Sequence, residues 1–317
     1  MISIDDVERA ARTIAGRVHR TPLLGSASLS ERLDARAFVK AELFQRTGSF
    51  KVRGALNRLA ELSDEERARG VISISAGNHA QAVAWSAREA GLDALVVMWQ
   101  GADELKVAAT RGYGARIDQE AANPTEAFDR LEVLHAETGR TLVHPFDDAA
   151  VLAGQGTVAL EILEDRAVPD VVVVPVGGGG LISGIATAVK ARRPSARIVA
   201  VEPERSTALH DALEAGRPVP VTPQSAADAL SAPFAGARAV EICSSLGVES
   251  VLVSEDELFY GFRWLYVRTK LAAELGGAAA VAALLTGKVE VEPGQTVVAV
   301  VSGGNIAPKQ AAAILIS

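Results

Sequence analysis

The stretch VVVVPVGGGGLISG, residues 171–184, decides the fold, because a strand, a glycine run and a helix follow one another in it. Its β-branched opening predicts a strand that is buried on both faces, as in a parallel sheet. The consecutive glycines let the backbone curl closely around an anion, and the N–H groups that open the next helix supply positive potential. One or two glycines suffice for a tight turn, so the longer run favours a phosphate site.

Two other predicted strands also end in glycine-containing loops. Residues 71–75 run into AGNHAQ, and residues 296–302 run into GGN. Ligands of open α/β sheets bind beyond the carboxyl ends of the strands, so the three loops predict one shared site. Further strands are expected at residues 37–40, 94–98 and 198–202. They alternate with helix-period segments, which predicts an α/β fold with parallel sheets.

Composition narrows the class of protein. The 317 residues suffice for two domains, and 49% hydrophobic with 22% charged residues is ordinary for a globular protein. The net charge of −7 argues against binding to nucleic acid or an anionic membrane. Cys243 is the only cysteine, and the start of the chain does not resemble a signal peptide. Both features lead us to expect a cytoplasmic protein. The five histidines are scattered, so we expect no metal site.

Lys51 is unusual in its surroundings, TGSFKVRGA, because no acid follows it before Glu61. We expect Thr47 and Ser49 to cap a helix that begins near the lysine. A helix start and burial beside Phe50 both disfavour an ammonium and should lower the lysine pKa. A neutral lysine amine can attack an aldehyde, so lysine and phosphate loop together predict pyridoxal phosphate (PLP) as cofactor.

A nicotinamide-dependent oxidoreductase is the alternative from another cofactor class. The glycine run fits neither the Walker motif nor G-x-G-x-x-G. However, Glu202 ends a strand about twenty residues further on, where a dinucleotide fold places a ribose-binding acid. This interpretation leaves Lys51 and the two other loops without a role.

Seven ordered motifs resemble one enzyme family. TGSFKVRGA, SAGNHAQAVA, HPFDD, AGQGTVALEI, VPVGGGGLISG, VEPE and SGGN are similar in order and spacing to the serine/threonine dehydratase and serine racemase group of fold-type II PLP enzymes. The resemblance implies a tryptophan-synthase-β-like α/β fold with two parallel-sheet domains. Residues 1–53 and 147–317 would form a large PLP-binding domain, and residues 54–146 a small inserted one. It also implies a homodimer that acts on a small amino acid.

The resemblance also implies roles for individual residues. Lys51 would hold the cofactor covalently, Phe50 would pack near its ring, and Asn78 would bond its phenolic oxygen. Ser302 would face the pyridine nitrogen. The phosphate would lie on the amides of Gly177, Gly178, Gly179, Gly180 and Leu181, and the substrate carboxylate near Ser75, Ala76, Gly77, Asn78 and His79.

Two positions bear on the type of reaction. The hydroxyl of Ser302 can donate to a neutral pyridine nitrogen but cannot supply a charge that keeps it protonated, which suits β-elimination. Related racemases carry a serine where this chain has Ala76, so no hydroxyl would protonate the second face of the substrate. The sequence therefore predicts a dehydratase (ammonia-lyase) for L-threonine or L-serine. A serine or hydroxyaspartate racemase is the alternative within the family.

Several departures from the family pattern predict a reshaped pocket. The family's divalent-metal site would need an acid where Ala208 stands, so no such site is expected. Trp99 and Ala229 replace the usual proline and glycine, and ELGGA replaces EPAGA from Glu274 onward. The proline-containing stretch of residues 216–236 is expected to be a long ordered loop near the site.

Overall fold

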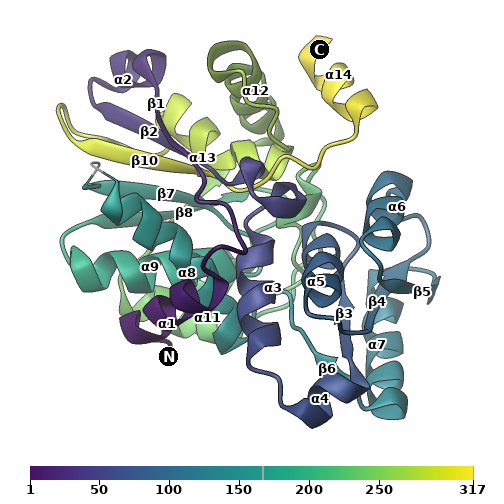
Figure 1. Ribbon diagram of the computed structural model, residues 1–317. Coiled ribbons are helices and arrows are strands. Elements are labelled where there is room, and N and C mark those ends of the chain that lie inside the picture. Colours follow the sequence, from purple (N-terminus) through teal and green to yellow (C-terminus); the bar gives the residue numbers. More distant parts are fainter. Residues whose placement is uncertain (166–167, 317) are drawn as a thin grey trace.

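The computed structural model describes residues 1–165 and 168–316 and is built around two sheets (Figure 1). The larger sheet has six strands in the order β1-β2-β10-β7-β8-β9. All neighbours in it are parallel except β1 and β2, which pair antiparallel. Its strands are β1 (Leu23–Gly25), β2 (Arg36–Ala41), β7 (Val171–Pro175), β8 (Arg197–Pro203), β9 (Glu249–Val253) and β10 (Thr296–Val301).

The smaller sheet is parallel and has the order β5-β4-β3-β6. All its strands come from residues 71–142, within the range predicted for the inserted domain; the domain division itself stays a prediction. The strands are β3 (Val71–Ile74), β4 (Ala94–Trp99), β5 (Arg116–Ala121) and β6 (Thr141–Leu142).

The predicted α/β class is confirmed, and so are the six strands that were expected from apolar runs, with their ends shifted by a residue or two. The expectation of parallel sheets needs one correction, because β1 runs antiparallel to β2. Sequence patterns also missed β1, β5, β6 and β9. These strands lie at the edges of the sheets and are short or partly exposed, so they lack the continuous apolar run of a buried strand.

Helices cover both faces of the larger sheet (Figure 1). One face packs against α2 (Ala27–Leu33), α12 (Glu255–Trp264) and α13 (Leu275–Leu285). The π-helix η4 (Leu265–Thr269) continues α12, and α14 (Pro308–Ile316) ends the described chain on the same side. The other face packs against α1 (Ile4–Ile14), α8 (Ala149–Glu164), α9 (Gly180–Arg192), α10 (Ala208–Ala215) and α11 (Ala237–Ser245).

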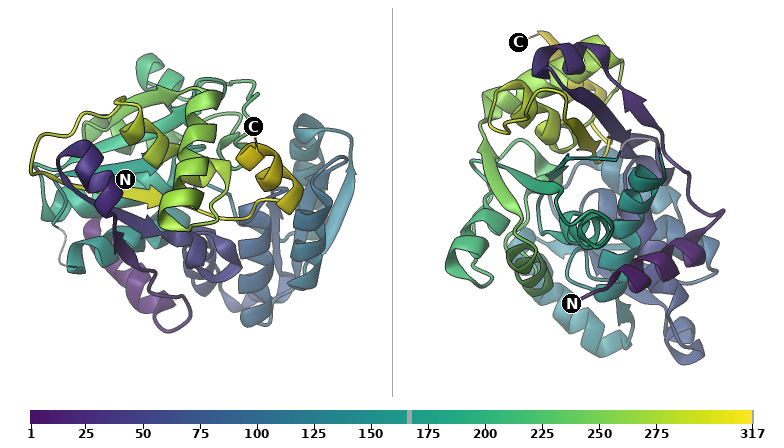
Figure 2. Two further views of the ribbon diagram at one scale, coloured as in Figure 1. Left: turned by 90° about the horizontal axis from the view of Figure 1, so that it is seen from above. Right: turned by 90° about the vertical axis from the view of Figure 1, so that its left-hand side faces the viewer.

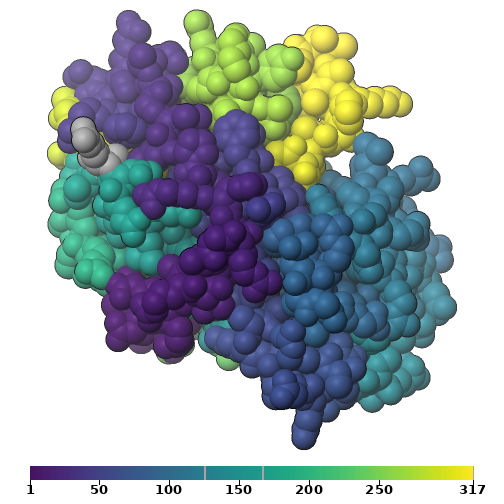
Figure 3. All heavy atoms as spheres, in the orientation of Figure 1, coloured from purple at the N-terminus to yellow at the C-terminus, as the bar shows by residue number. Residues whose placement is uncertain are grey.

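The smaller sheet is also covered on both faces, by α7 on one and by α3, α5 and α6 on the other. Figure 2 shows the two sheets with their helices side by side, and in Figure 3 the N-terminal segment in purple lies over their junction. Among the described residues, no helix is long and apolar enough to cross a membrane. The remaining elements are α3 (Lys51–Ala60), α4 (Asp64–Arg69), α5 (Asn78–Glu89), α6 (Glu104–Gly112), α7 (Pro124–Thr138), η1 (Glu42–Phe44), η2 (Arg46–Gly48) and η3 (Asp228–Leu230).

Three helices pack unusually closely through glycines, and they carry two of the predicted site segments. A Cβ atom added to Gly154 of α8 would lie 2.6 Å from the Cα of Gly54 in α3. One added to Gly184 of α9 would lie 2.4 Å from the backbone nitrogen of Gly156 in α8. Because backbone touches backbone at both crossings, the starts of α3 and α9 have fixed positions relative to each other.

A buried charge network holds the first turn of α3. The guanidinium of Arg53, which is 0% exposed, bonds Glu42 at 2.8 Å and Glu161 at 2.7 Å. Glu161 also bonds the buried ammonium of Lys40 at 2.6 Å. Two cations therefore face two carboxylates, and each charge has a partner that offsets its loss of water.

Replacing Arg53 by methionine should destabilise the protein by about 3–5 kcal/mol, because it leaves a buried carboxylate without its partner. Urea unfolding followed by circular dichroism measures the change. Arg58→Met is the matched control, since Arg58 bonds Asp148 at 3.0 Å nearer the surface and should cost about 1 kcal/mol or less. Similar losses in both variants would contradict the special role of the buried network.

Candidate active site

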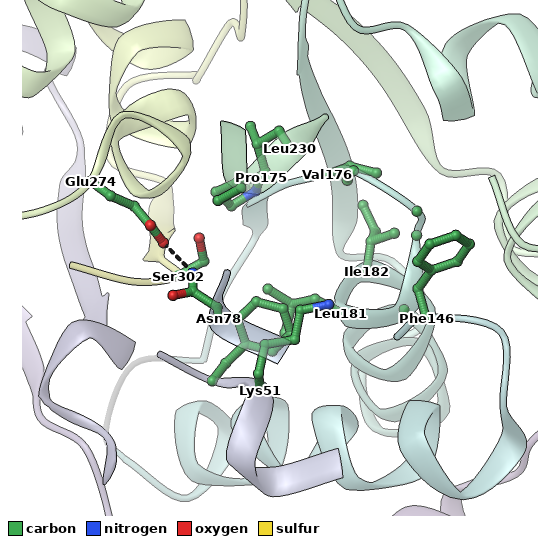
Figure 4. Close-up of a pocket in the computed structure, with 16 residues that line it drawn as sticks. Lys51, Asn78, Phe146, Pro175, Val176, Leu181, Ile182, Leu230, Glu274 and Ser302 are labelled. Atoms are coloured by element: carbon green, nitrogen blue, oxygen red, sulfur yellow. Dashed lines mark hydrogen bonds between the residues drawn. The ribbon is translucent and has the colours of Figure 1, made fainter. Parts of the chain in front are cut away.

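A pocket lies at the carboxyl ends of β7 and β10, where the glycine loops meet the starts of α3 and α5 (Figure 4). Figure 4 shows Glu274 and Ser302 on one side of it and Phe146 and Ile182 on the other. The pocket brings together every residue predicted to bind the cofactor: Phe50, Lys51, Asn78, Gly177, Gly178, Gly179, Gly180, Leu181 and Ser302. Ala229 and Leu230 of η3 also line it, so the long loop of residues 216–236 reaches the pocket as expected.

The glycine loop between β7 and α9 is shaped for close approach. Gly179 has a φ of +90°, which side chains disfavour, and no side chain of the described residues caps α9. A Cβ atom on Gly178 would lie 2.2 Å from the ring of Phe146, and one on Gly179 would lie 2.4 Å from Ala239. The first amides of α9 lack partners within the helix, so they can bind an anion such as a phosphate.

Lys51 is the first residue of α3, and its side chain enters the pocket. Its Nζ donates to the carbonyl of Pro145 at 2.9 Å and lies 5.3 Å from the ring centroid of Phe50. Burial lowers the pKa of Lys51 to about 8, against a smaller opposing effect of the Glu274 carboxyl. The direction agrees with the prediction, with burial as the cause, and a substantial fraction of the amine is neutral near pH 8.

The predicted caps of α3 are wrong. Phe50 occupies the N-cap position, and neither the hydroxyl of Thr47 nor that of Ser49 has a hydrogen-bond partner within the described chain. Thr47 instead lies in a left-handed turn with a φ of 60° inside η2, and Ser49 is buried in a bridge to Gly303. The sequence spacing did not reveal this turn, because Asn305, far along the chain, helps to hold it by donating to the carbonyl of Thr47.

The segment predicted to bind the substrate forms the turn between β3 and α5. The hydroxyl of Ser75 accepts from the N–H of Gly77 at 3.1 Å, and α5 begins at Asn78. Asn78 lines the pocket, whereas Ser75, Ala76 and Gly77 are half-buried in the turn before it. Nε2 of His79 donates to a backbone carbonyl, and burial lowers the pKa of His79 to about 3, so this ring is neutral.

Phe146 and Glu274 are two of the pocket residues that were not predicted as site residues. Phe146, which belongs to the HPFDD motif, packs against the glycine loop. Glu274 reaches the pocket from the start of α13. Glu274 is only 2% exposed, and its Oε1 accepts from Nδ2 of Asn78 at 2.6 Å. An acid inside the apolar stretch LAAELGGAAAVAALL was the available signal for Glu274.

Glu202 does not take the role that the nicotinamide interpretation gave it. Its two carboxylate oxygens accept from the backbone N–H groups of Leu209 and His210, at 2.8 and 2.7 Å. The side chain is fully buried and does not line the pocket. It holds the start of α10 away from the pocket, so it is not placed to bind a ribose there.

Comparison with known proteins agrees with this pocket. The family model of the pyridoxal-phosphate dependent enzymes matches residues 14–303. The chain belongs to this family. Its cofactor is therefore PLP, and the glycine loop beside the half-buried Lys51 fits that group, which carries both a phosphate and an aldehyde.

The similar proteins have related activities. The catabolic L-threonine dehydratase TdcB of Staphylococcus aureus is 42% identical over 313 residues, which cover 96% of this chain and 90% of that protein. The threonine deaminase of T.th. is 40% identical with a TM-score of 0.90, over 96% of this chain and 99% of the other. Maize serine racemase is 34% identical with a TM-score of 0.93, over 97% and 95%.

Proposed function

We propose that this protein is a PLP-dependent ammonia-lyase that converts L-threonine or L-serine into a 2-oxo acid and ammonia. The observation that carries the proposal is a pocket in which a half-buried lysine of lowered pKa lies with a glycine loop suited to a phosphate and the hydroxyl of Ser302. The similarity to a threonine dehydratase and a threonine deaminase supports the same activity.

The bound cofactor supplies an aldehyde that joins amines and draws electrons from the α-carbon of the substrate. We assign the phosphate to the amides of Gly177, Gly178, Gly179, Gly180 and Leu181. Ser302, at the end of β10, would donate a hydrogen bond from its hydroxyl to the pyridine nitrogen without adding charge. Phe50 packs beside the lysine, and Asn78 offers its amide at the start of α5.

Lys51 is the general base of the reaction. Its neutral Nζ takes the proton from the α-carbon, and desolvation by burial raises the fraction of neutral amine above that of an ordinary lysine. The substrate carboxylate is bound at the start of α5 by the turn of Ser75, Ala76 and Gly77 with Asn78 and His79, where the helix offers free amides. The glycine loop would hold the phosphate that supplies the proton with which the β-hydroxyl leaves as water. The released enamine then hydrolyses to the 2-oxo acid and ammonia.

Product analysis of the purified holoprotein tests the activity. With L-threonine it should release 2-oxobutanoate and ammonia in equal amounts, and with L-serine pyruvate and ammonia. Heat-inactivated protein with free PLP is the control for the slow reaction of the cofactor alone. Absence of both 2-oxo acids above this control would overturn the proposed function.

Ala76 favours elimination over racemisation, although maize serine racemase shares the fold. We expect L-serine to yield pyruvate with negligible D-serine, because no hydroxyl at position 76 can protonate the second face. Ala76→Ser should raise D-serine relative to pyruvate, modestly, since a hydroxyl without a tuned environment is a weak acid. Chiral chromatography measures both enantiomers. Abundant D-serine from the unmodified protein would instead support the racemase.

We also propose that the protein acts as a cytoplasmic homodimer. Tyr260 on α12 and Tyr266 and Val267 on η4 are exposed apolar side chains on neighbouring turns, which suits a contact between two copies. Light scattering after size-exclusion chromatography should give twice the mass of 33.0 kDa. The mass of a single chain would contradict the dimer.

A further inference from the structure

A chain of amides ends at Glu274 in the pocket. Nδ2 of Asn305, in the loop after β10, donates to the carbonyl of Thr47 and to Oδ1 of Asn78, each at 2.7 Å. Nδ2 of Asn78 then donates to Oε1 of Glu274 at 2.6 Å. Four segments that are far apart in the sequence thus share one line of hydrogen bonds.

The carbonyl of Thr47 determines which group donates and which accepts in each of these hydrogen bonds. The carbonyl of Thr47 can only accept, so Asn305 must present its NH₂ group there. The same NH₂ group faces Asn78, which must therefore present its oxygen to Asn305 and its NH₂ group to Glu274. It follows that Oε1 of Glu274 is the acceptor in its bond with Asn78.

The other carboxyl oxygen of Glu274 is left over. Oε2 is buried and has no hydrogen-bond partner within residues 1–165 and 168–316. The nearby cations are engaged elsewhere, since Lys106 of α6 is paired with Asp228 of η3 and Lys51 bonds the carbonyl of Pro145. Asp228 adds a second negative charge near Glu274. A carboxylate here would be a buried ion without a salt bridge, which is costly.

We propose that Glu274 is a positioning residue that works as a neutral carboxylic acid, with Oε1 accepting from Asn78 and a proton on Oε2 that donates into the pocket. The proposal rests on the proposed function, because it gives Glu274 a task in the PLP site. Burial and the charge of Asp228 raise the pKa of Glu274 to about 7, which agrees with the geometry.

A neutral Glu274 has a chemical consequence for the ligand. Asn78 keeps a second N–H group, and beside it the Oε2–H group is a further donor at the same end of the pocket. Two neighbouring donors suit an anionic oxygen of the ligand. The pair adds no negative charge on the side of the pocket where Ser302 lies (Figure 4).

Replacing Glu274 by glutamine distinguishes a neutral carboxylic acid at this position from a carboxylate. Glu274→Gln keeps an acceptor for Asn78 and places an N–H donor where the proton of Oε2 would lie, so it should bind PLP within about threefold of the unmodified protein. Glu274→Ala removes both contacts and should weaken PLP binding by about 10–100-fold. The dissociation constant is measured by fluorescence titration of the apoprotein, so it does not depend on turnover.

Infrared difference spectroscopy of the apoprotein between pH 6 and pH 9 observes the proton directly. A protonated carboxyl band should be present at the lower pH, disappear on titration and be missing in Glu274→Gln. Glu202→Gln is the matched control, because Glu202 is also buried and its pKa is also raised, but both its oxygens are bonded to α10. Asn305→Asp should reverse the amide line and weaken PLP binding about as much as Glu274→Ala.

The outcomes distinguish the two proposals. Glu274 works as an anion, and the inference is wrong, if two results are found together. Glu274→Gln binds PLP as poorly as Glu274→Ala, and the infrared difference spectrum of Glu274→Gln lacks no protonated carboxyl band that the unmodified protein shows. If the glutamine variant behaves as expected while the unmodified protein releases no 2-oxo acid, the inference stands and the proposed function fails. Circular dichroism of each variant shows whether it is folded before its binding is interpreted.

Discussion

Lys51→Ala is expected to lower the turnover of L-threonine by about 10²–10⁴-fold, the range that a positioned general base contributes. It should also abolish covalent attachment of the cofactor, because the substitution removes the amine that lies beside Phe50 in the pocket. Borohydride reduction of the holoprotein followed by peptide mass mapping should find the pyridoxyl group on Lys51. A label on Lys106, which also lies near Glu274, would overturn the assignment.

The pKa of Lys51 gives this prediction a pH dependence. Only the neutral amine attacks the aldehyde, and the pKa is lowered to about 8, so the rate of cofactor capture by the apoprotein should rise with pH and level off above about 8. An unperturbed lysine would still be gaining neutral amine near its ordinary pKa of about 10.4. Stopped-flow absorbance after mixing with PLP separates the two cases.

Gly178→Ala is expected to weaken PLP binding by about 100-fold or more while the fold is retained. The added Cβ would lie 2.2 Å from the ring of Phe146, far inside contact distance. That ring packs edge-on against both His144 and Phe234, so it cannot turn aside, and the loop must move away from its phosphate-binding shape. Equilibrium titration of the apoprotein measures the loss.

A second substitution tests the steric cause. Phe146→Leu in the Gly178→Ala background removes part of the ring and should recover some affinity, a coupling that a double-mutant cycle quantifies. Gly112→Ala is the control, because a Cβ there meets nothing within 4 Å at the end of α6. Independent effects of the two substitutions at Gly178 and Phe146 would contradict the clash.

The central strands could be predicted from sequence because their continuous runs of apolar β-branched residues indicate burial on both faces of a sheet. The valines of β7 are buried on both faces of the sheet, and β10 repeats the pattern. The edge strand β5 reads RIDQEA and is mostly half-exposed, so its alternation is weak. β9 has a charged start and lies at the other sheet's edge, where partners on only one side define it.

The site was predictable only where one segment contains the chemistry. The glycine loop and Lys51 each combine residue type and local context within a few positions, which is why both were found. Glu274 and Asn305 acquire their roles through Asn78, more than 190 residues away in sequence. The prediction for Thr47 failed for a related reason, because its turn is held by Asn305 as well as by the local bond from the N–H of Gly48 to the carbonyl of Gln45.

The pairing of β2 with β10 constrains how the protein emerges from the ribosome. The smaller sheet comes from residues 71–142 and can pair while translation continues. β2, which leads into the lysine helix, must wait with one edge unpaired until residues 296–301 are made. Unpaired strand edges promote aggregation, so chains whose translation stops before β10 should depend on chaperones. The same strand, β10, joins β2 to β7 and brings Ser302 to the pocket and Asn305 to Asn78. The cofactor site is therefore among the last parts of the nascent chain to form.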